Sequence, residues 1–314
     1  MTPEIVTIHD RASGAAAQIL ASQGFNCFRF TAMAGARPVE VLYAPDDFGA
    51  GEGRPSRGGI PLLLPFPGRI PGTTFTWEAK QYSLEAGDAF GNAIHGFALS
   101  RPWRVIEQSE NKVGGQFHAW RDDPSLKARW PADFRITATY TLAGNTLKAE
   151  YLIENPCDVA LPCGFGTHPY FRVPLGGEKA DACIVRLPVS ARWELKEMLP
   201  TGRRLGLENA AALQAGQPYG ELKFDDAFTG LQFASGECAA SIHDPASGRT
   251  VTQRFDTAFR ECVVYTPPHR EAICIEPLTC VPNCFELNSR GIDVGLRIVP
   301  PGGSFTAQVE IDVT

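Results

Sequence analysis

The sequence predicts an all-β protein folded as one large sandwich, and three observations carry this prediction. Residues 134–142 (FRITATYTL) alternate between apolar and polar side chains, as a strand with one buried face does. Residues 146–154 repeat the alternation, and a short loop with Gly144 and Asn145 lies between the two segments. Both loop residues are suited to positive φ, so we expect an antiparallel hairpin. Sustained helical periodicity is scarce along the rest of the chain.

Other short segments rich in β-branched and apolar residues are separated by clusters of Gly, Pro and Asp, as strands and turns are. They span residues 26–31, 39–43, 103–108, 183–187, 239–243, 262–265, 272–276, 293–299 and 304–313. The two helix candidates that are long enough, residues 13–23 and 207–214, are Ala-rich but have no sustained helical stripe. The 31 glycines and 25 prolines are spread between strands and no internal repeat is found, so residues 1–314 are expected to form one domain.

The composition excludes several classes of protein. Apolar residues make up 44% and charged residues 20% of the 314 residues, as in an ordinary globular protein with a packed core. A net charge of −6 opposes binding to phosphate backbones, so we expect no nucleic-acid partner. The longest apolar run, residues 60–66, contains two prolines and is too short to span a bilayer. Residues 1–23 lack the pattern of a secretory signal, which favours a cytoplasmic protein without a membrane partner.

The cysteines suggest neither disulfides nor metal binding. Their number, nine, is odd, and they are scattered through a large chain, so we expect reduced and mostly buried thiols. Cys280 and Cys284 are separated by three residues and have no histidine nearby, which is a poor pattern for zinc. We therefore expect no metal site.

Two histidines lie in segments that suit a ligand site. His95 lies between a polar turn and a glycine in residues 91–97 (GNAIHGF), where the backbone can approach a ligand. The alternative is a buried histidine that bonds to a backbone carbonyl. His168 precedes Pro169, which favours an extended conformation, and Tyr170 and Phe171 then supply a rigid apolar wall.

Glu276 is expected at the end of the apolar strand 272–276, just before the strand-stopping Pro277. A carboxylate there is costly unless it is paired, solvated or functional. Together with His168 it could supply the base and the acid that proton transfer requires. The alternative is an ion pair that bridges two strands.

Two more segments carry charges of the kind that binds polyhydroxylated ligands. Arg69 follows a Pro- and Gly-rich turn, and Asp225 and Asp226 lie between two aromatic residues in residues 224–228 (FDDAF). A guanidinium and a carboxylate can each make two hydrogen bonds to neighbouring hydroxyls. Each segment, taken alone, is equally typical of a solvated loop.

In their order along the chain, these segments resemble the aldose 1-epimerase (galactose mutarotase-like) family. In that family an arginine precedes an Asn-x-x-His-Gly segment, followed by His-Pro-Tyr-Phe, an Asp-x-x-Phe and a late Glu-Pro. The resemblance runs from about residue 60 to the C-terminus, where residues 300–304 are similar to the family's Pro-Gly-rich turn. The matching positions are Arg69, Asn92, His95, His168, Asp225 and Glu276.

The resemblance implies a β-supersandwich of large antiparallel sheets with a sugar-binding groove. It implies interconversion of the α and β anomers of a hexose or related aldose by acid and base catalysis, without a cofactor, in a monomer or homodimer. Glu276 would be the base and His168 the acid. The substrate-binding residues would be Arg69, Asn92, His95 and Asp225, with Asp226 as the alternative to Asp225.

Departures from the family pattern leave the sugar open. Phe97 stands where many galactose-specific members have Gly, and Arg172 stands where they have Asn. Arg172, together with Arg69, could bind a phosphate as in the hexose-6-phosphate epimerase branch. Arg172 is equally consistent with a solvated loop residue. A noncatalytic carbohydrate-binding protein on this fold is a competing hypothesis, but the presence of both His168 and Glu276 argues against it. A polysaccharide lyase or hydrolase domain is a more remote one, which would need an extended cleft and usually more exposed aromatic residues.

Overall fold

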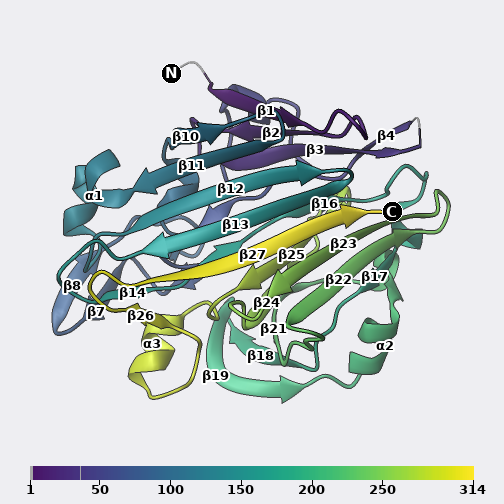
Figure 1. The fold of residues 1–314 in the computed structure, drawn as a ribbon. Coiled ribbons are helices and arrows are strands. Elements are labelled where there is room, and N and C mark those ends of the chain that lie inside the picture. The colour runs from purple at the N-terminus through teal and green to yellow at the C-terminus, as the bar shows by residue number, and fades with distance from the viewer. Residues whose placement is uncertain (1–2, 36) are drawn as a thin grey trace.

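The structure is a computed structural model that describes residues 3–35 and 37–314 (Figure 1). Strands make up most of its regular secondary structure, and two large antiparallel sheets of nine and eight strands lie face to face. A four-stranded sheet and three two-stranded ladders complete the β-structure. The predicted all-β class and the supersandwich of large antiparallel sheets are confirmed.

The two large sheets are built from strands that are mostly far apart in the sequence. In order across the sheet, the nine-stranded sheet contains β10 (Arg104–Gln108), β11 (Lys112–His118), β12 (Arg135–Ala143), β13 (Thr146–Glu154), β27 (Ser304–Val313), β23 (Arg249–Asp256), β22 (Glu237–Asp244), β17 (Ile184–Arg186) and β20 (Gln217–Pro218). The eight-stranded sheet contains, in the same sense, β19 (Leu199–Gly206), β18 (Ala191–Lys196), β21 (Asp225–Thr229), β24 (Glu261–Tyr265), β25 (Ala272–Leu278), β15 (Gly166–Thr167) and β5 (Leu62–Leu63), with β16 (Tyr170–Arg172) also paired to β25.

The smaller elements lie at the edges and ends of these sheets. The four-stranded sheet contains β1 (Ile5–His9), β2 (Ala16–Leu20), β3 (Asn26–Ala34) and β4 (Arg37–Glu40), and the ladders are β14 (Leu161–Cys163) with β26 (Arg297–Val299), β6 (Arg69–Ile70) with β9 (Ala93–Ile94), and β7 (Thr74–Trp77) with β8 (Lys80–Ser83). The α-helices in the described residues are α1 (Ala119–Asp122), α2 (Ala210–Ala215) and α3 (Cys284–Ser289), and 3₁₀ turns span Phe48–Ala50, Ala98–Ser100, Pro124–Ala128, Ala180–Ala182 and Tyr219–Glu221.

The predicted hairpin is present as β12 and β13. Ala143 pairs with Thr146, so the connection is a two-residue turn. Gly144 has the expected positive φ of 60°, but Asn145 is not among the residues with positive φ. Instead, the Asn145 side chain accepts a hydrogen bond from the backbone N–H of Met33 at 2.8 Å and donates one to its carbonyl at 2.7 Å. The asparagine therefore ties the hairpin to the four-stranded sheet.

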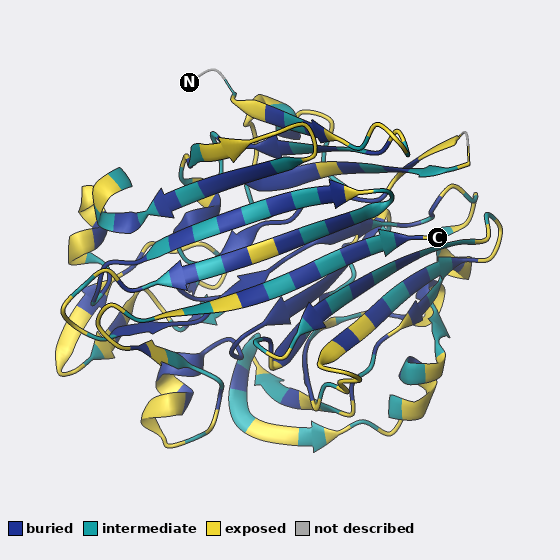
Figure 2. Ribbon diagram, viewed as in Figure 1, coloured by how far each residue is buried: buried dark blue, intermediate teal, exposed yellow. Residues whose placement is uncertain are grey.

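The main core lies between the two large sheets. Buried and partly exposed residues alternate along β12 and β13, as the sequence pattern predicts (Figure 2). Ile273 and Ile275 of β25, in the eight-stranded sheet, belong to the same hydrophobic cluster as the buried residues of β12 and β13. The rings of Tyr151 on β13 and Phe165 before β15 lie 4.9 Å apart between centroids, which links the two layers.

Strand β25 is buried on both faces, and this places the functional side chains. Whereas Ile273 and Ile275 point into the main core, Ala272 and Cys274 belong to a second cluster with Tyr170. Since side chains alternate along a strand, Glu276 lies on the face of Ala272 and Cys274. The eight-stranded sheet thus packs one face on the nine-stranded sheet and uses the other to hold polar side chains.

Several predicted elements need correction. Residues 13–23 are not a helix, because residues 16–20 form β2 between β1 and β3, with Ala17 and Ile19 buried in the core. Pairing on both sides overrides the helical propensity of alanine here. Residues 207–214 are helical only in part, as α2. The strands predicted at 39–43 and 293–299 are shorter, ending at Glu40 and starting at Arg297.

Glu276 is not at a strand end. Strand β25 continues through Pro277 to Leu278, with Pro277 facing Cys262 of β24. On the side away from β24, β25 pairs with β15 only at Gly166. Because Pro277 has no backbone N–H, it can be accommodated where few hydrogen bonds link the two strands.

All nine cysteines are free, and eight of them are buried. Within residues 3–35 and 37–314, no helix combines the length and the apolar character needed to cross a bilayer.

Candidate active site

His168 and Glu276 face each other across neighbouring strands. Gly166 of β15 pairs with Leu278 of β25, and Tyr170 of β16 pairs with Cys274 of the same strand. Continuing this register from either side makes His168 the partner of Glu276. Their side chains meet, with His168 Nε2 3.1 Å from Glu276 Oε1. The strand pairing therefore brings together two residues that are more than a hundred positions apart in the sequence.

Burial controls the protonation of this pair. The side chains of His168 and Glu276 are only 8% and 4% exposed. Desolvation lowers the pKa of His168 to about 3. Desolvation also raises the pKa of Glu276 well above its ordinary value, the nearby Asp225 carboxylate adds to this rise, and Arg69 opposes it. The pair with two protons carries a positive charge and the pair with none carries a negative charge, and burial disfavours both. The pair therefore tends to hold a single proton.

His95 lies beside this pair, at the end of β9. Its backbone takes a positive φ of 65°, and its backbone N–H donates to the Gly68 carbonyl at 2.8 Å. The ring Nδ1 accepts a hydrogen bond from the Gly68 N–H at 3.2 Å, which leaves Nε2 as the N–H of a neutral ring. The His95 ring meets the His168 ring edge to face at 5.5 Å between centroids. Burial, together with the His168 and Arg69 charges, lowers the pKa of His95 well below its ordinary value.

Arg69, on β6, is held by an acid that no sequence motif marks. Its Nε donates to Asp88 Oδ2 at 2.9 Å. Asp88 Oδ2 also accepts from the Asn92 side-chain amide at 3.0 Å, and Asn92 Oδ1 accepts from the Gly72 N–H at 3.0 Å. Asn92, predicted to bind substrate, is therefore occupied in holding Asp88 and does not line the pocket. The sequence around Asp88 gives no signal for this role, because Asp88 lies in the loop between β8 and β9 and its partner Arg69 comes from β6.

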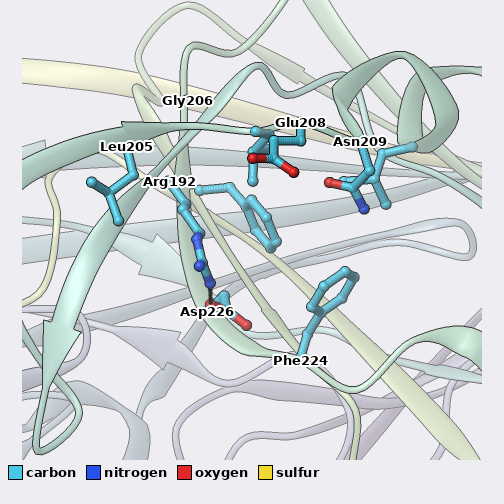
Figure 3. A pocket seen from close by; sticks show the side chains of 10 residues that line it. Arg192, Leu205, Gly206, Glu208, Asn209, Phe224 and Asp226 are labelled. Carbon is cyan, nitrogen blue, oxygen red and sulfur yellow. Dashed lines mark hydrogen bonds and ion pairs between the residues drawn. The ribbon is translucent and has the colours of Figure 1, made fainter.

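Asp225 and Asp226 point to different places. Asp225 lines the pocket with His168 and Glu276; burial by surrounding atoms raises the pKa of its carboxyl, while Arg69 opposes that rise. Asp226 accepts a hydrogen bond from Arg192 at 3.0 Å in a separate pocket of about 510 Å³ (Figure 3). Between the two acids that the sequence left open, Asp225 is the one beside the histidine–glutamate pair.

A pocket of about 290 Å³ collects most of the predicted site residues on this face of the eight-stranded sheet. Arg69, His95, His168, Asp225 and Glu276 all line it. Its remaining wall includes Tyr170, which the sequence predicted as part of an apolar wall, and residues that the sequence did not indicate, namely Arg54, Ser56, Arg57, Asp88, Phe90 and Tyr265. They come from loops or from strands whose register a single sequence does not reveal.

Arg172 is not among the residues that line this pocket. Its guanidinium lies over the ring of Tyr43, 5.4 Å from the centroid, and its Nε is buried without a hydrogen-bond partner among the described residues. This placement fits neither a phosphate ligand in the pocket nor a solvated loop residue.

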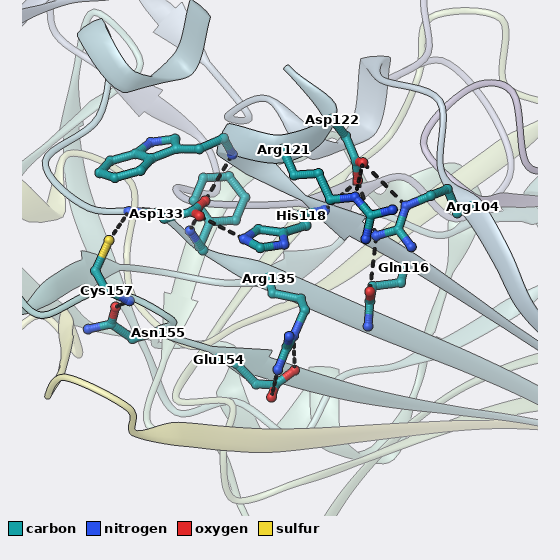
Figure 4. A network of polar contacts seen from close by, with 12 residues as sticks. Arg104, Gln116, His118, Arg121, Asp122, Asp133, Arg135, Glu154, Asn155 and Cys157 are labelled. Atoms are coloured by element: carbon teal, nitrogen blue, oxygen red, sulfur yellow. Dashed lines mark hydrogen bonds and ion pairs between the residues drawn. The ribbon is translucent and has the colours of Figure 1, made fainter. Parts of the chain in front are cut away.

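A histidine–carboxylate contact alone does not define a site, as a second one shows (Figure 4). His118 Nε2 lies 2.7 Å from Asp133 Oδ2, at the end of β11. The other oxygen of Asp133 accepts the backbone N–H groups of Trp120 and Phe134, so this carboxylate organises a chain turn. Neither His118 nor Asp133 lines the pocket that holds His168 and Glu276. Among the described residues, no group of three or more potential metal ligands is present.

Comparison with known proteins identifies relatives of this chain in sequence and in fold. A family model described as aldose 1-epimerase matches residues 35–312. The uncharacterized protein YihR of Escherichia coli strain K12 is 24% identical over 242 residues, which cover 74% of this chain and 72% of that protein. The structure of a galactose mutarotase-like protein from Clostridium acetobutylicum has a TM-score of 0.85 and 22% identity, and covers 100% of this chain and 99% of its own. Galactose 1-epimerase from Lactobacillus acidophilus has a TM-score of 0.70 and 18% identity, with coverage of 100% and 99%. At these identities the two structures show a shared fold.

Proposed function

The chain belongs to the aldose 1-epimerase family, and on that basis we propose that it interconverts the α and β anomers of an aldose. The observation that carries the proposal is the contact of 3.1 Å between His168 Nε2 and Glu276 Oε1 inside a pocket of about 290 Å³. The anomeric hydroxyl and the ring oxygen of a cyclic sugar are bonded to the same carbon. An acid and a base that serve these two oxygens must therefore lie close together, as these two side chains do.

In the proposed reaction, Glu276 removes the proton from the anomeric hydroxyl, and the His168 imidazolium gives a proton to the ring oxygen. The bond between the anomeric carbon and the ring oxygen breaks, and the anomeric carbon becomes an aldehyde. After rotation about the C1–C2 bond, the ring closes on the other face of the carbonyl. In that step protonated Glu276 is the acid and neutral His168 is the base, so the pair returns to its starting state.

Burial of the pair supports this exchange of roles. A raised pKa makes Glu276 a stronger base, and a lowered pKa makes the His168 imidazolium a stronger acid. Burial therefore favours the transfer of the proton from the His168 imidazolium to Glu276, which is the net proton transfer of the opening step.

The other pocket residues would bind and orient the sugar. The Nε2–H of neutral His95 and the guanidinium of Arg69 would donate to the oxygen that gains negative charge during opening. The Asp225 carboxylate, at the pocket wall, would accept hydrogen bonds from hydroxyls farther along the sugar. Asp88 and Asn92 would keep Arg69 in position.

Polarimetry of freshly dissolved α anomers tests the proposal. The wild-type protein should accelerate the change in rotation above the spontaneous rate, and Glu276→Gln should lower kcat by about 10²–10⁴-fold, the usual contribution of a positioned acid or base. Glu261→Gln is the matched control, because Glu261 is also a buried strand glutamate but accepts a hydrogen bond from Trp193 outside the pocket. Near-normal turnover by Glu276→Gln would remove Glu276 from the mechanism. A wild-type protein that binds sugars without changing their anomers would refute the proposed activity.

A further inference from the structure

Two arginines at the pocket wall have no hydrogen-bond or ion-pair partner among residues 3–35 and 37–314. Arg54 and Arg57 line the same pocket as His168 and Glu276, and both are exposed. Among the described residues, neither guanidinium makes an ion pair or a hydrogen bond, whereas Arg69 in the same pocket is paired with Asp88 at 2.9 Å. The pocket therefore presents two unpaired positive charges to whatever enters it.

The loop that carries these arginines is anchored. The Tyr170 hydroxyl donates to the Ser56 carbonyl at 2.8 Å, and the Asn26 side chain donates to the Gly58 carbonyl at 3.0 Å. The backbone N–H of Arg57 donates to the carbonyl of Arg54 at 3.1 Å, so one turn projects both side chains. Two of these hydrogen bonds hold the loop backbone to the rest of the protein and the third closes its turn, so the two arginine side chains leave the backbone at defined positions beside the pocket.

The anchoring also places the loop close to His168. The ring of Tyr170 stacks on His168 at 4.8 Å between centroids, and the hydroxyl of the same ring holds Ser56. The loop thus begins one aromatic ring away from His168. On the same side, burial raises the pKa of Tyr265 and the Arg57 charge opposes the rise, which puts Arg57 near Tyr265. In the proposed reaction the anomeric carbon lies at His168 and Glu276, so Arg54 and Arg57, on the far side of the Tyr170 ring from His168, would reach a part of the sugar away from that carbon.

A neutral aldose does not need two unpaired cations, because hydroxyls are bound as well by neutral groups or by carboxylates such as Asp225. Guanidinium groups are suited to planar, paired hydrogen bonds with anionic oxygens, and these bonds are stronger than those between neutral groups. We propose that the pocket takes an aldose carrying an anionic oxygen group, such as a phosphate, sulfonate or carboxylate, at the end remote from the anomeric carbon, and that Arg54 and Arg57 bind this group. The inference rests on the proposed function and names its substrate class.

The test compares one sugar with and without the anionic group. The anomerisation of glucose, glucose 6-phosphate, its 6-sulfonate counterpart and glucuronate is followed by polarimetry for wild type, Arg54→Gln, Arg57→Gln and the double variant. We expect wild type to prefer at least one anionic sugar. The double variant should raise KM for that sugar by about 10- to 150-fold, the equivalent of one hydrogen bond to a charged group, and change KM for glucose little. Arg172→Gln is the control, since Arg172 carries the same charge but does not line the pocket.

Binding measured without turnover separates this inference from the proposed activity. 1,5-Anhydroglucitol and its 6-phosphate lack the anomeric hydroxyl, so calorimetry with wild type and the double variant reports recognition alone. Tighter binding of the phosphorylated analogue, lost in the double variant, supports the anion site even if no sugar is anomerised. Equal affinity for the two analogues, together with equal use of glucose and every anionic sugar, overturns the inference even if anomerisation is fast. A loss of affinity in Arg172→Gln and not in the double variant also overturns it.

Discussion

The ring of Tyr170 lies parallel to the imidazole of His168, with 4.8 Å between their centroids and 4° between their planes. His168 Nδ1 is buried and has no hydrogen-bond partner among the described residues. The orientation of the imidazole therefore depends on this stacking and on the contact of Nε2 with Glu276.

Replacing Tyr170 separates its two contacts. Tyr170→Phe keeps the stacked ring and loses only the hydroxyl that holds Ser56, so kcat for a neutral sugar should stay close to wild type. Tyr170→Leu loses the stacking, which is worth about 0.5–1.5 kcal/mol for an aromatic pair, and kcat should fall by up to about 10-fold. Steady-state polarimetry and thermal melting of both variants check this. Equal kcat in the two variants would mean that stacking does not position His168.

The two histidines of the pocket can be distinguished by the same substitution. His168→Asn should remove most of the rate, by about 10²–10⁴-fold, because it removes the proposed proton donor. His95→Asn keeps a side-chain acceptor for the Gly68 N–H, and asparagine tolerates the positive φ of 65° at this position, so the fold should be preserved. Its rate should fall less than that of His168→Asn. The reverse order of the two rates would make His95 the proton donor.

The pH profile should have a broad plateau. Below the pKa of His168, which burial lowers to about 3, the pair holds two protons, and above the raised pKa of Glu276 it holds none. Between these limits it holds the one proton that the reaction needs, so kcat/KM should be flat across the ordinary values of about 4.3 for Glu and about 6.5 for His. The limits belong to the coupled pair and not to either residue. Rates are compared after subtraction of the spontaneous reaction at each pH. A narrow bell between about pH 4.3 and 6.5, the two ordinary values, would contradict the effect of burial.

His168→Asn should also change the shape of this profile. With one titrating group left, the residual rate should rise with pH as Glu276 ionises and then stay level. An alkaline limb that survives in the variant would point to another proton donor, with His95 as the first to examine.

Glu276 should lower the stability of the protein at neutral and alkaline pH. Its folded-state pKa is raised above the unfolded value, so the folded state binds more protons and stability falls as pH rises from the unfolded pKa, about 4.3, through the folded pKa. Glu276→Gln removes this fall. The Tm of the variant should therefore exceed that of wild type by a margin that grows as pH rises above the unfolded pKa of about 4.3, up to the folded pKa of Glu276. Glu150→Gln, at an exposed position on β13, is the control and should show no such trend. A margin that does not change with pH would argue that burial leaves the Glu276 pKa unshifted.

Asp88 should act through Arg69. Asp88→Asn removes the negative partner of the guanidinium at 2.9 Å, and kcat/KM should fall by about 10-fold or more, the equivalent of a charged hydrogen bond. Asp226→Asn is the matched control, because it breaks the ion pair with Arg192 in the separate pocket. Equal losses in the two variants, measured with the same sugar, would show that Asp88 has no specific role in the site.

The sequence predicted the elements whose signal lies within one continuous segment. The hairpin β12–β13 and the last strand β27 were predicted with little or no error, because each strand is long and, in the hairpin, alternation is regular. The pairing of His168 with Glu276 was proposed on chemical grounds, but its register comes from β15 and β16, strands of two and three residues that leave no periodic signal. The loop of Arg54 and Arg57 has no such signal either. Its place beside the pocket depends on hydrogen bonds from Tyr170, which is more than a hundred positions away in the sequence, and from Asn26, which lies on β3.

Strand β27 lies between β13 and β23 in the nine-stranded sheet and joins its two parts (Figure 1). A ribosome adds about 5–20 residues per second, and residues 304–313 are made after every other strand of this sheet. Until they emerge, the facing edges of β13 and β23 have no partner in the nascent chain, and unpaired edges favour aggregation. The sheet can be closed only after residues 304–313 have been translated, so its two parts form before the strand that joins them.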